Sequence, residues 1–217
     1  MAPRWGEHLK TIAIDFETAN PRPGNACQIG LAWIEGARVV RVEERFIRPR
    51  DMEFTFTWVH GITAAHVTDA PEFPQMLAEF HDELDGALVL AHNARFDAGV
   101  MRGCARAYGV RQPKMKYLCT LDIARRVWPE LKSKALRSVA AHLGIPFTHH
   151  NAAEDARACA EVAIAAANIV GALSHEIWGV TWFWGEKSTR TVALWRPRSW
   201  RNRSNRRLSM SSQTYGR

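Results

Sequence analysis

The chain has 217 residues, of which 47% are hydrophobic and 24% charged, a composition that excludes a disordered chain and predicts a globular, soluble protein. Its formal net charge of +7 is concentrated at one end, because residues 185–217 hold nine basic residues and one acid, a net charge of +8, whereas residues 1–184 are near neutral. The four cysteines form no C-x-x-C pair, which excludes a zinc site and a disulfide framework and favours reduced thiols.

The sequence also indicates where the protein resides. The N-terminal residues contain no apolar signal region. The longest apolar stretch, residues 162–173, is interrupted by Asn168 and is too short to span a bilayer. We therefore expect a cytoplasmic location and no membrane partner.

The first half of the chain predicts three strands followed by helices. Residues 10–15 (KTIAID) are a short β-branched run typical of a buried strand, and residues 28–35 and 38–47, with Gly36 between them, predict a hairpin. Thr63 is expected to cap a short helical turn that ends near residue 66. Apolar residues at helical intervals predict a helix over residues 73–84.

The second half alternates strands and helices. Residues 87–91 (ALVLA) are all apolar, as in a central strand covered on both faces, and Asn93 is expected to cap a helix that runs to about residue 108. A short strand over residues 117–120 and helices over residues 121–127 and 135–143 follow. Asn151 begins a long alanine-rich helix, with Glu154 at capping-box spacing. This order predicts an α/β fold with a mixed five-stranded sheet flanked by helices.

Four acids and one histidine lie at the ends of these elements. Asp15 and Glu17 are two residues apart on a strand and so share a face. Asp97 and Asp155 each fall in the first turns of a helix, and His150 precedes the second of these helices. Taken singly, each has an ordinary explanation: a solvated turn, an acid that complements a helix dipole, or a structural histidine.

Taken together, these residues predict a site for phosphodiester hydrolysis. Four carboxylates at one point would repel each other unless cations neutralised them. Two divalent ions roughly 3.5–4 Å apart would do so and would clamp a phosphodiester for in-line attack. Histidine has a pKa suited to taking a proton from water near neutral pH.

Four ordered motifs resemble the DEDD exonucleases, in the DEDDh branch that carries a histidine in its third motif. The motifs are IDFETAN (14–20), VHGIT (59–63), AHNARFD (91–97) and HNAAEDA (150–156), and the likeness covers residues 11–170. It is greatest to the proofreading epsilon subunit of bacterial DNA polymerase III and its stand-alone relatives. The resemblance implies a ribonuclease H-like fold and a 3′→5′ exonuclease that releases nucleoside 5′-monophosphates.

The resemblance also implies roles for individual residues. Asp15, Glu17, Asp97 and Asp155 would hold two Mg²⁺ or Mn²⁺ ions, and His150 would activate the attacking water. The neighbouring His149 misses by one residue the five-residue step to Asp155 that the motif has. Residues implied to contact or support the terminal nucleotide are Phe16, Thr18, His60, Asn93 and Phe96.

The expected substrate is a single-stranded 3′ end, because a base stacked on an apolar wall must be unpaired. DNA is preferred over RNA because HGIT and HNARFD resemble the proofreading branch most. An RNA-trimming exoribonuclease of the same fold is the first alternative. A non-catalytic nucleic-acid-binding module, or a subunit whose partner is a DNA polymerase, is the second.

The chain is expected to divide into an exonuclease domain, residues 1–173, and a basic extension rich in tryptophan and arginine, residues 174–217. The extension has the composition of a segment that grips a nucleic-acid backbone, and equally that of a disordered tail.

Overall fold

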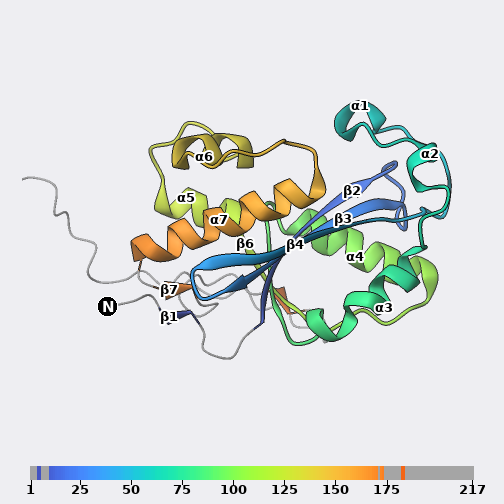
Figure 1. The fold of residues 1–217 in the computed structure, drawn as a ribbon, viewed down its shortest axis with the longest axis horizontal. Helices are drawn as coiled ribbons and strands as arrows, with labels where there is room; N and C mark the ends of the chain where they lie inside the picture. The colour runs from blue at the N-terminus through green and yellow to red at the C-terminus, as the bar shows by residue number, and fades with distance from the viewer. Residues whose placement is uncertain (1–3, 6–9, 171, 174–181, 184–217) are drawn as a thin grey trace, which may run out of the picture.

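A mixed β-sheet forms the centre of the computed structural model, which describes residues 4–5, 10–170, 172–173 and 182–183 (Figure 1). The strands β2 (Thr11–Thr18), β3 (Ala26–Glu35) and β4 (Arg38–Phe46) are antiparallel neighbours, and β5 (Leu88–Ala91) and β6 (Lys116–Cys119) continue the sheet parallel to β2. The order β4-β3-β2-β5-β6 confirms the predicted five-stranded sheet. A two-residue strand, β8 (Trp182–Phe183), extends it beside β6, and β1 (Arg4–Trp5) pairs separately with β7 (Ala172–Leu173).

Helices cover both faces of this sheet (Figure 1). The helices α3 (Phe73–Leu84) and α4 (Arg95–Tyr108) lie on one face, and α5 (Thr120–Val127), α6 (Leu136–Leu143) and α7 (Ala152–Val170) lie on the other. Two short helices, α1 (Thr57–His60) and α2 (Ala64–Val67), belong to the connection between β4 and α3. Within the described residues, no helix is both long enough and apolar enough to cross a membrane.

Strand β2 separates two cores because its side chains alternate between the faces of the sheet. Ile12, Ile14 and Phe16 pack with residues of α3 and α4. Ala13 packs on the opposite face, with the buried alanines of α7. Asp15 and Glu17 follow Ala13 on that second face, at the end of the strand that lies next to the start of α7.

Gly30 of β3 allows α7 to lie directly on the sheet. Gly30 is the cross-strand partner of Asp15. A Cβ atom at Gly30 would lie 1.9 Å from the carbonyl oxygen of Ala152 and 2.5 Å from the backbone nitrogen of Ala153, far inside van der Waals contact. The first turn of α7 therefore rests against the one residue type that leaves space for its backbone.

Of the two asparagines expected to cap helices, one does so and the other does not. Asn151 caps α7 as expected, with its Oδ1 accepting a hydrogen bond from the Glu154 N–H at 3.0 Å. The cap expected at Asn93 is wrong, because Ala94 holds the N-cap position of α4. Asn93 instead adopts a left-handed backbone with φ of 72°, and its carbonyl accepts the Phe96 N–H at 2.8 Å. The chain thus turns sharply out of β5 before α4 begins.

The contact at Gly30 gives a stability prediction. We expect Gly30→Ala to lower the free energy of unfolding by about 2 kcal/mol or more, because overpacking against backbone atoms cannot relax through a rotamer change. That loss corresponds to roughly 4–8 °C in melting temperature for a chain of this size. Thermal unfolding followed by circular dichroism measures it.

Gly99→Ala is the matched control, because a Cβ atom there meets nothing within 4 Å and Gly99 lies inside a helix. It should raise the melting temperature slightly, since alanine favours a helix over glycine by about 0.5–1 kcal/mol. Equal stability of the two variants would contradict the close approach of α7 to β3.

Candidate metal centre and active site

Three carboxylates from two elements converge where α7 meets β2. Asp15 and Glu17 come from the end of β2, and Asp155 comes from the first turn of α7. One ligand oxygen from each lies within 4.8 Å of the others. Asp155 is buried, whereas Asp15 and Glu17 are partly exposed. The structure therefore brings together three of the four predicted acids in a cluster that an ion could enter from one side.

The fourth acid, Asp97, lies beside this cluster and is held by the backbone. Strand pairing between β2 and β5 ends at Ala13 and Leu90. Beyond that point the Asp97 Oδ1 accepts a hydrogen bond from the Phe16 N–H at 3.1 Å. Asp97 of α4 thus lies where β2 and β5 separate, bonded to Phe16, the residue that follows Asp15 in β2.

Burial and mutual repulsion raise the pKa values of these acids. Desolvation raises the pKa of Asp15 well above its ordinary value, and the charges of Asp97, Asp155 and Glu17 raise it further. Burial and the charge of Asp155 raise the pKa of Glu17 to about 7. Burial raises the pKa of Asp97 to about 7 as well, although its hydrogen bond from Phe16 acts in the opposite direction.

The donor set fits hard divalent cations. The charges of Asp97, Asp155 and Glu17 all raise the pKa of Asp15, so negative charge accumulates at this point of the fold. A cation bound among these carboxylates would offset that charge. Mg²⁺ and Mn²⁺ prefer oxygen ligands and would supply this positive charge. The residues present are thus suited to the ions that the four acids predict.

Two adjacent histidines precede α7, and the structure distinguishes them. The His149 Nδ1 lies 2.8 Å from Asp155 Oδ1, whereas His150 contacts the same carboxylate through its backbone N–H, at 2.7 Å from Oδ2. Their rings stack with centroids 3.9 Å apart. His150, the predicted base, has a left-handed backbone with φ of 66°. Burial and the neighbouring His149 lower the pKa of His150, which favours the neutral imidazole that can accept a proton.

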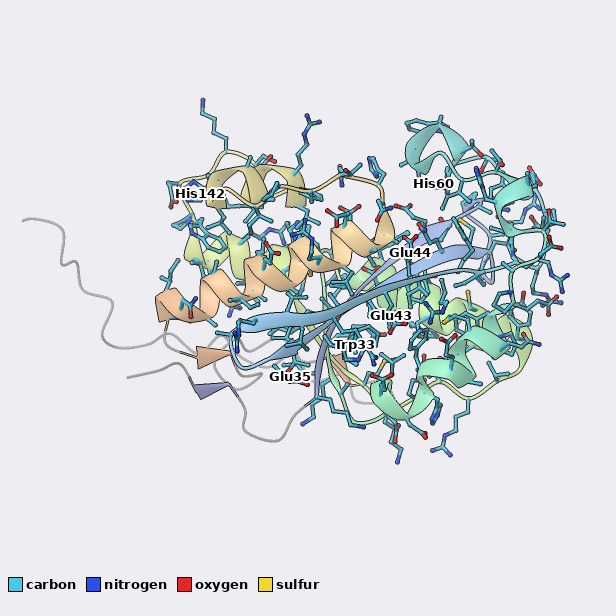
Figure 2. The ribbon with its side chains drawn as sticks, viewed as in Figure 1. Trp33, Glu35, Glu43, Glu44, His60 and His142 are labelled. Atoms are coloured by element: carbon cyan, nitrogen blue, oxygen red, sulfur yellow. The ribbon has the colours of Figure 1, made fainter. Side chains whose placement is uncertain are left out.

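His60 lies at the end of α1 (Figure 2), and two backbone groups hold its ring. Its Nδ1 accepts the Ile62 N–H at 3.0 Å, so its Nε2 carries the proton and donates to the Thr18 carbonyl at 3.1 Å. Burial lowers the pKa of His60 and keeps the ring neutral. The ring therefore ties α1 to the end of β2, directly after Glu17.

Of the other four residues expected to contact or support a nucleotide, two line a common pocket and two do not. The Phe16 ring is only 2% exposed and packs beneath α3 and α4, away from the carboxylates. Thr18 and Phe96 line one pocket of about 650 Å³, and the Phe96 side chain is 46% exposed. Asn93 is exposed in the turn before α4 and does not line that pocket.

Comparison with known proteins identifies the family. The RNase T family model, described as "Exonuclease", matches residues 12–163. The chain therefore belongs to this family of phosphodiester-hydrolysing exonucleases. It is 32% identical over 157 residues to the PolC-type DNA polymerase III of Caldanaerobacter subterraneus subsp. tengcongensis, a match that covers 70% of this chain and 11% of the polymerase. The chain thus spans about a tenth of the length of the curated relatives that it matches.

Solved structures share the fold. Exonuclease X in complex with 5′-overhanging duplex DNA superimposes with a TM-score of 0.62 at 23% identity, covering 74% of this chain and 93% of the other. The nuclease domain of 3′hExo, a DEDDh family member bound to rAMP, gives a TM-score of 0.64 at 16% identity, covering 76% and 95%. These similarities confirm the predicted ribonuclease H-like fold.

Two features of the site were not predicted from the sequence. The role of Gly30 could not be predicted from the sequence, because it depends on the helix that packs over this residue in the fold. His149 was visible in the sequence but was set aside on motif spacing alone. Its ring contacts Asp155 in a segment where the next residue, His150, has a left-handed backbone, and residue spacing reveals neither feature.

The raised pKa values give a prediction about metal and pH. A carboxylate with a folded pKa near 7 and an unfolded pKa near 4 favours folding at low pH, and this contribution is lost as pH rises from about 4 to about 7. We therefore expect Mg²⁺ or Mn²⁺ to raise the melting temperature more at pH 8 than at pH 5.5. Differential scanning fluorimetry with and without EDTA measures this difference.

Asp15→Asn should raise the melting temperature of the EDTA-treated protein at pH 8, since it removes one of the repelling charges, and should reduce the response to metal. Asp122→Asn is the matched control, because Asp122 is an acid outside the cluster that pairs with Arg125. A metal response equal in Asp15→Asn and wild type would argue against ion binding at this cluster.

Proposed function

We propose that this chain is a metal-dependent 3′→5′ exonuclease that removes nucleoside 5′-monophosphates from single-stranded DNA ends. The observation that carries the proposal is the convergence of Asp15, Glu17 and Asp155, with Asp97 beside them, in a member of the exonuclease family. These four acids would hold two Mg²⁺ or Mn²⁺ ions, which when bound would supply the positive charge that activates water and stabilises the pentavalent phosphate.

The rest of the mechanism belongs to side chains of the chain itself. We assign the proton acceptor to His150, because its lowered pKa keeps the imidazole neutral near pH 7. His149 would orient Asp155 through the contact between Nδ1 and Oδ1. His60 would keep Thr18 and the end of β2 in place, and Thr18 and Phe96 would contact the terminal nucleotide from the pocket that they share.

The choice between DNA and RNA as substrate rests on fewer observations than the reaction itself. The motifs HGIT and HNARFD favour DNA, as do the PolC-type relatives and the DNA bound to Exonuclease X. The rAMP bound to 3′hExo supports the RNA-trimming alternative. Association with a DNA polymerase is a further proposal, since the polymerase relatives carry the matching segment within a much longer chain. A non-catalytic module is disfavoured because all four acids are present.

A cleavage assay tests the reaction. Purified protein is incubated with a 5′-labelled single-stranded DNA oligomer or its RNA counterpart, in Mg²⁺, Mn²⁺ or EDTA. We expect a ladder that shortens from the 3′ end only when metal is present, and at least 10²-fold slower cleavage by Asp15→Asn, because one ligand of the ions is weakened. The faster substrate identifies the preferred sugar.

Asp122→Asn serves as the folded control and should cleave at the wild-type rate. If the wild-type protein shortens neither strand in the presence of metal, the enzyme proposal fails and the binding-module alternative gains support.

Separate substitutions of the two histidines test their roles. We expect His150→Gln to lower kcat by about 10²–10⁴-fold at saturating metal, as loss of a general base does. His149→Gln should instead raise the metal concentration needed for half-maximal rate by about 10–100-fold, as loss of a hydrogen bond to a ligand does. Steady-state rates over a Mn²⁺ titration separate the two effects. The reverse pattern would assign the base to His149.

A further inference from the structure

Three polar side chains join the ends of two strands to α7. Because β5 and β6 pair in parallel up to Ala91 and Cys119, the residues that follow them, His92 and Thr120, lie side by side. The His92 Nδ1 lies 2.9 Å from the Thr120 Oγ1, and the Thr120 Oγ1 lies 3.3 Å from the Sγ of Cys159 in α7. His92, Thr120 and Cys159 thus form a polar network at the end of the sheet that also carries the carboxylates.

The direction of each hydrogen bond in the polar network follows from His92. Its Nε2 lies 2.9 Å from the Lys134 carbonyl, which can only accept, so Nε2 carries the ring proton. Burial lowers the pKa of His92 to about 4, which keeps the ring neutral and leaves Nδ1 as an acceptor. The Thr120 hydroxyl therefore donates to Nδ1 and accepts from the Cys159 thiol. The Ala91 carbonyl, 3.4 Å from the same hydroxyl, is its longest contact.

The polar network is close to the carboxylate cluster. Thr120 and Cys159 are fully buried. Burial raises the pKa of the Cys159 thiol well above its ordinary value, and the charges of Asp97 and Asp15 raise it further, so the thiol lies within reach of these carboxylates. Cys159 also follows Asp155 by one turn of α7, on the same side of the helix. A shift of Cys159 along the sheet would therefore move Asp155 with it.

The packing of α7 on the sheet does little to prevent such a shift. The buried side chains of α7 are mostly alanines. Helices are held in place by ridges of side chains that fit into grooves, and alanine forms only low ridges. Among the described residues, the other side-chain hydrogen bonds of α7 stay within the helix or reach residues 146–151 directly before it. The bond between Cys159 and Thr120 is thus the directional contact between α7 and the strand ends in this part of the protein.

We propose that the polar network positions Asp155 for cation binding. It sets where α7 lies along the strand ends, and so it fixes the distance of the Asp155 carboxylate from those of Asp15 and Glu17. Polar networks whose members are all paired specify one arrangement of a core in this way. The proposal rests on the metal site of the proposed exonuclease, and it assigns positioning roles to three side chains outside the carboxylates.

Mn²⁺ binding tests the role of Thr120. Thr120→Val keeps the side-chain volume but removes both hydroxyl bonds. We expect it to raise the Mn²⁺ dissociation constant, measured from the EPR signal of the free ion, by about 10–100-fold, as loss of a hydrogen bond behind a metal ligand does. Thr120→Ser keeps the hydroxyl and should bind Mn²⁺ nearly as tightly as wild type. Wild-type affinity in Thr120→Val, or no rescue by serine, would overturn the proposal.

Two buried cysteines provide a matched pair. Cys159→Ala removes the donor to Thr120 and should weaken Mn²⁺ binding. Cys104→Ala makes the same change in α4, in the core on the other face of the sheet, and should not. Both should lower the melting temperature, since each leaves a small cavity. A loss of affinity in Thr120→Val that Cys159→Ala does not share would contradict positioning through α7.

Hydrogen–deuterium exchange in EDTA tests the position of α7 without metal or substrate. In wild type the His150 N–H is bonded to Asp155 Oδ2. Thr120→Val should speed exchange in a peptide that covers residues 148–160 more than in peptides of β3, because local opening precedes global unfolding. Equal acceleration throughout the protein would show a general loss of stability and would overturn the proposal.

Failure of the proposed function is recognised separately. Wild-type protein that neither binds Mn²⁺ nor shortens an oligonucleotide would reject the exonuclease, and the exchange measurement in EDTA would still decide whether the polar network holds α7. If wild-type protein cleaves, the rate deficit of Thr120→Val should shrink as Mn²⁺ is raised, since a weakened site still fills at high concentration. A deficit that is the same at every Mn²⁺ concentration would count against positioning of a metal ligand.

Discussion

The contact between the start of α7 and Gly30 determines the geometry of the site. Because Gly30 has no side chain, the backbone of Ala152 and Ala153 lies directly on β3, beside the position of Asp15 on β2. That contact brings Asp155 within ligand distance of Asp15 and Glu17. The buried alanines further along α7 maintain the same close approach over the rest of the sheet. A helix with larger side chains on this face would stand further from the strands and separate the carboxylates.

The same close approach has an electrostatic cost. It places desolvated carboxylates next to each other, and their raised pKa values show that the metal-free site resists full ionisation. Without cations, the fold carries repulsion that packing on both faces of the sheet must offset. Function and stability therefore oppose each other at this cluster, as they commonly do at active sites. Cation binding relieves the repulsion and stabilises the fold at the same point.

Sequence patterns predicted the elements with strong periodicity and failed where the outcome depended on three-dimensional contacts. The helix over residues 73–84 and the apolar strand that precedes α4 follow from side-chain spacing, and the structure agrees with both. The four acids could be grouped because each lies at the end of a core element. The Asn93 cap failed because a tight turn out of β5 required a left-handed residue there, and asparagine tolerates that conformation. His149 was set aside because spacing alone does not show which of two adjacent rings turns toward Asp155.

Helix α4 fixes the fourth carboxylate of the site through one rigid element. Its first turn holds Asp97 against the Phe16 backbone, and the buried residues Met101 and Cys104 pack the helix against the same core as β2. The position of Asp97 relative to Asp15 is therefore set by the packing of a helix on a strand, and it does not depend on the conformation of a loop. Ligands held in this way need little rearrangement when cations bind, so the binding free energy is not reduced by the cost of ordering them.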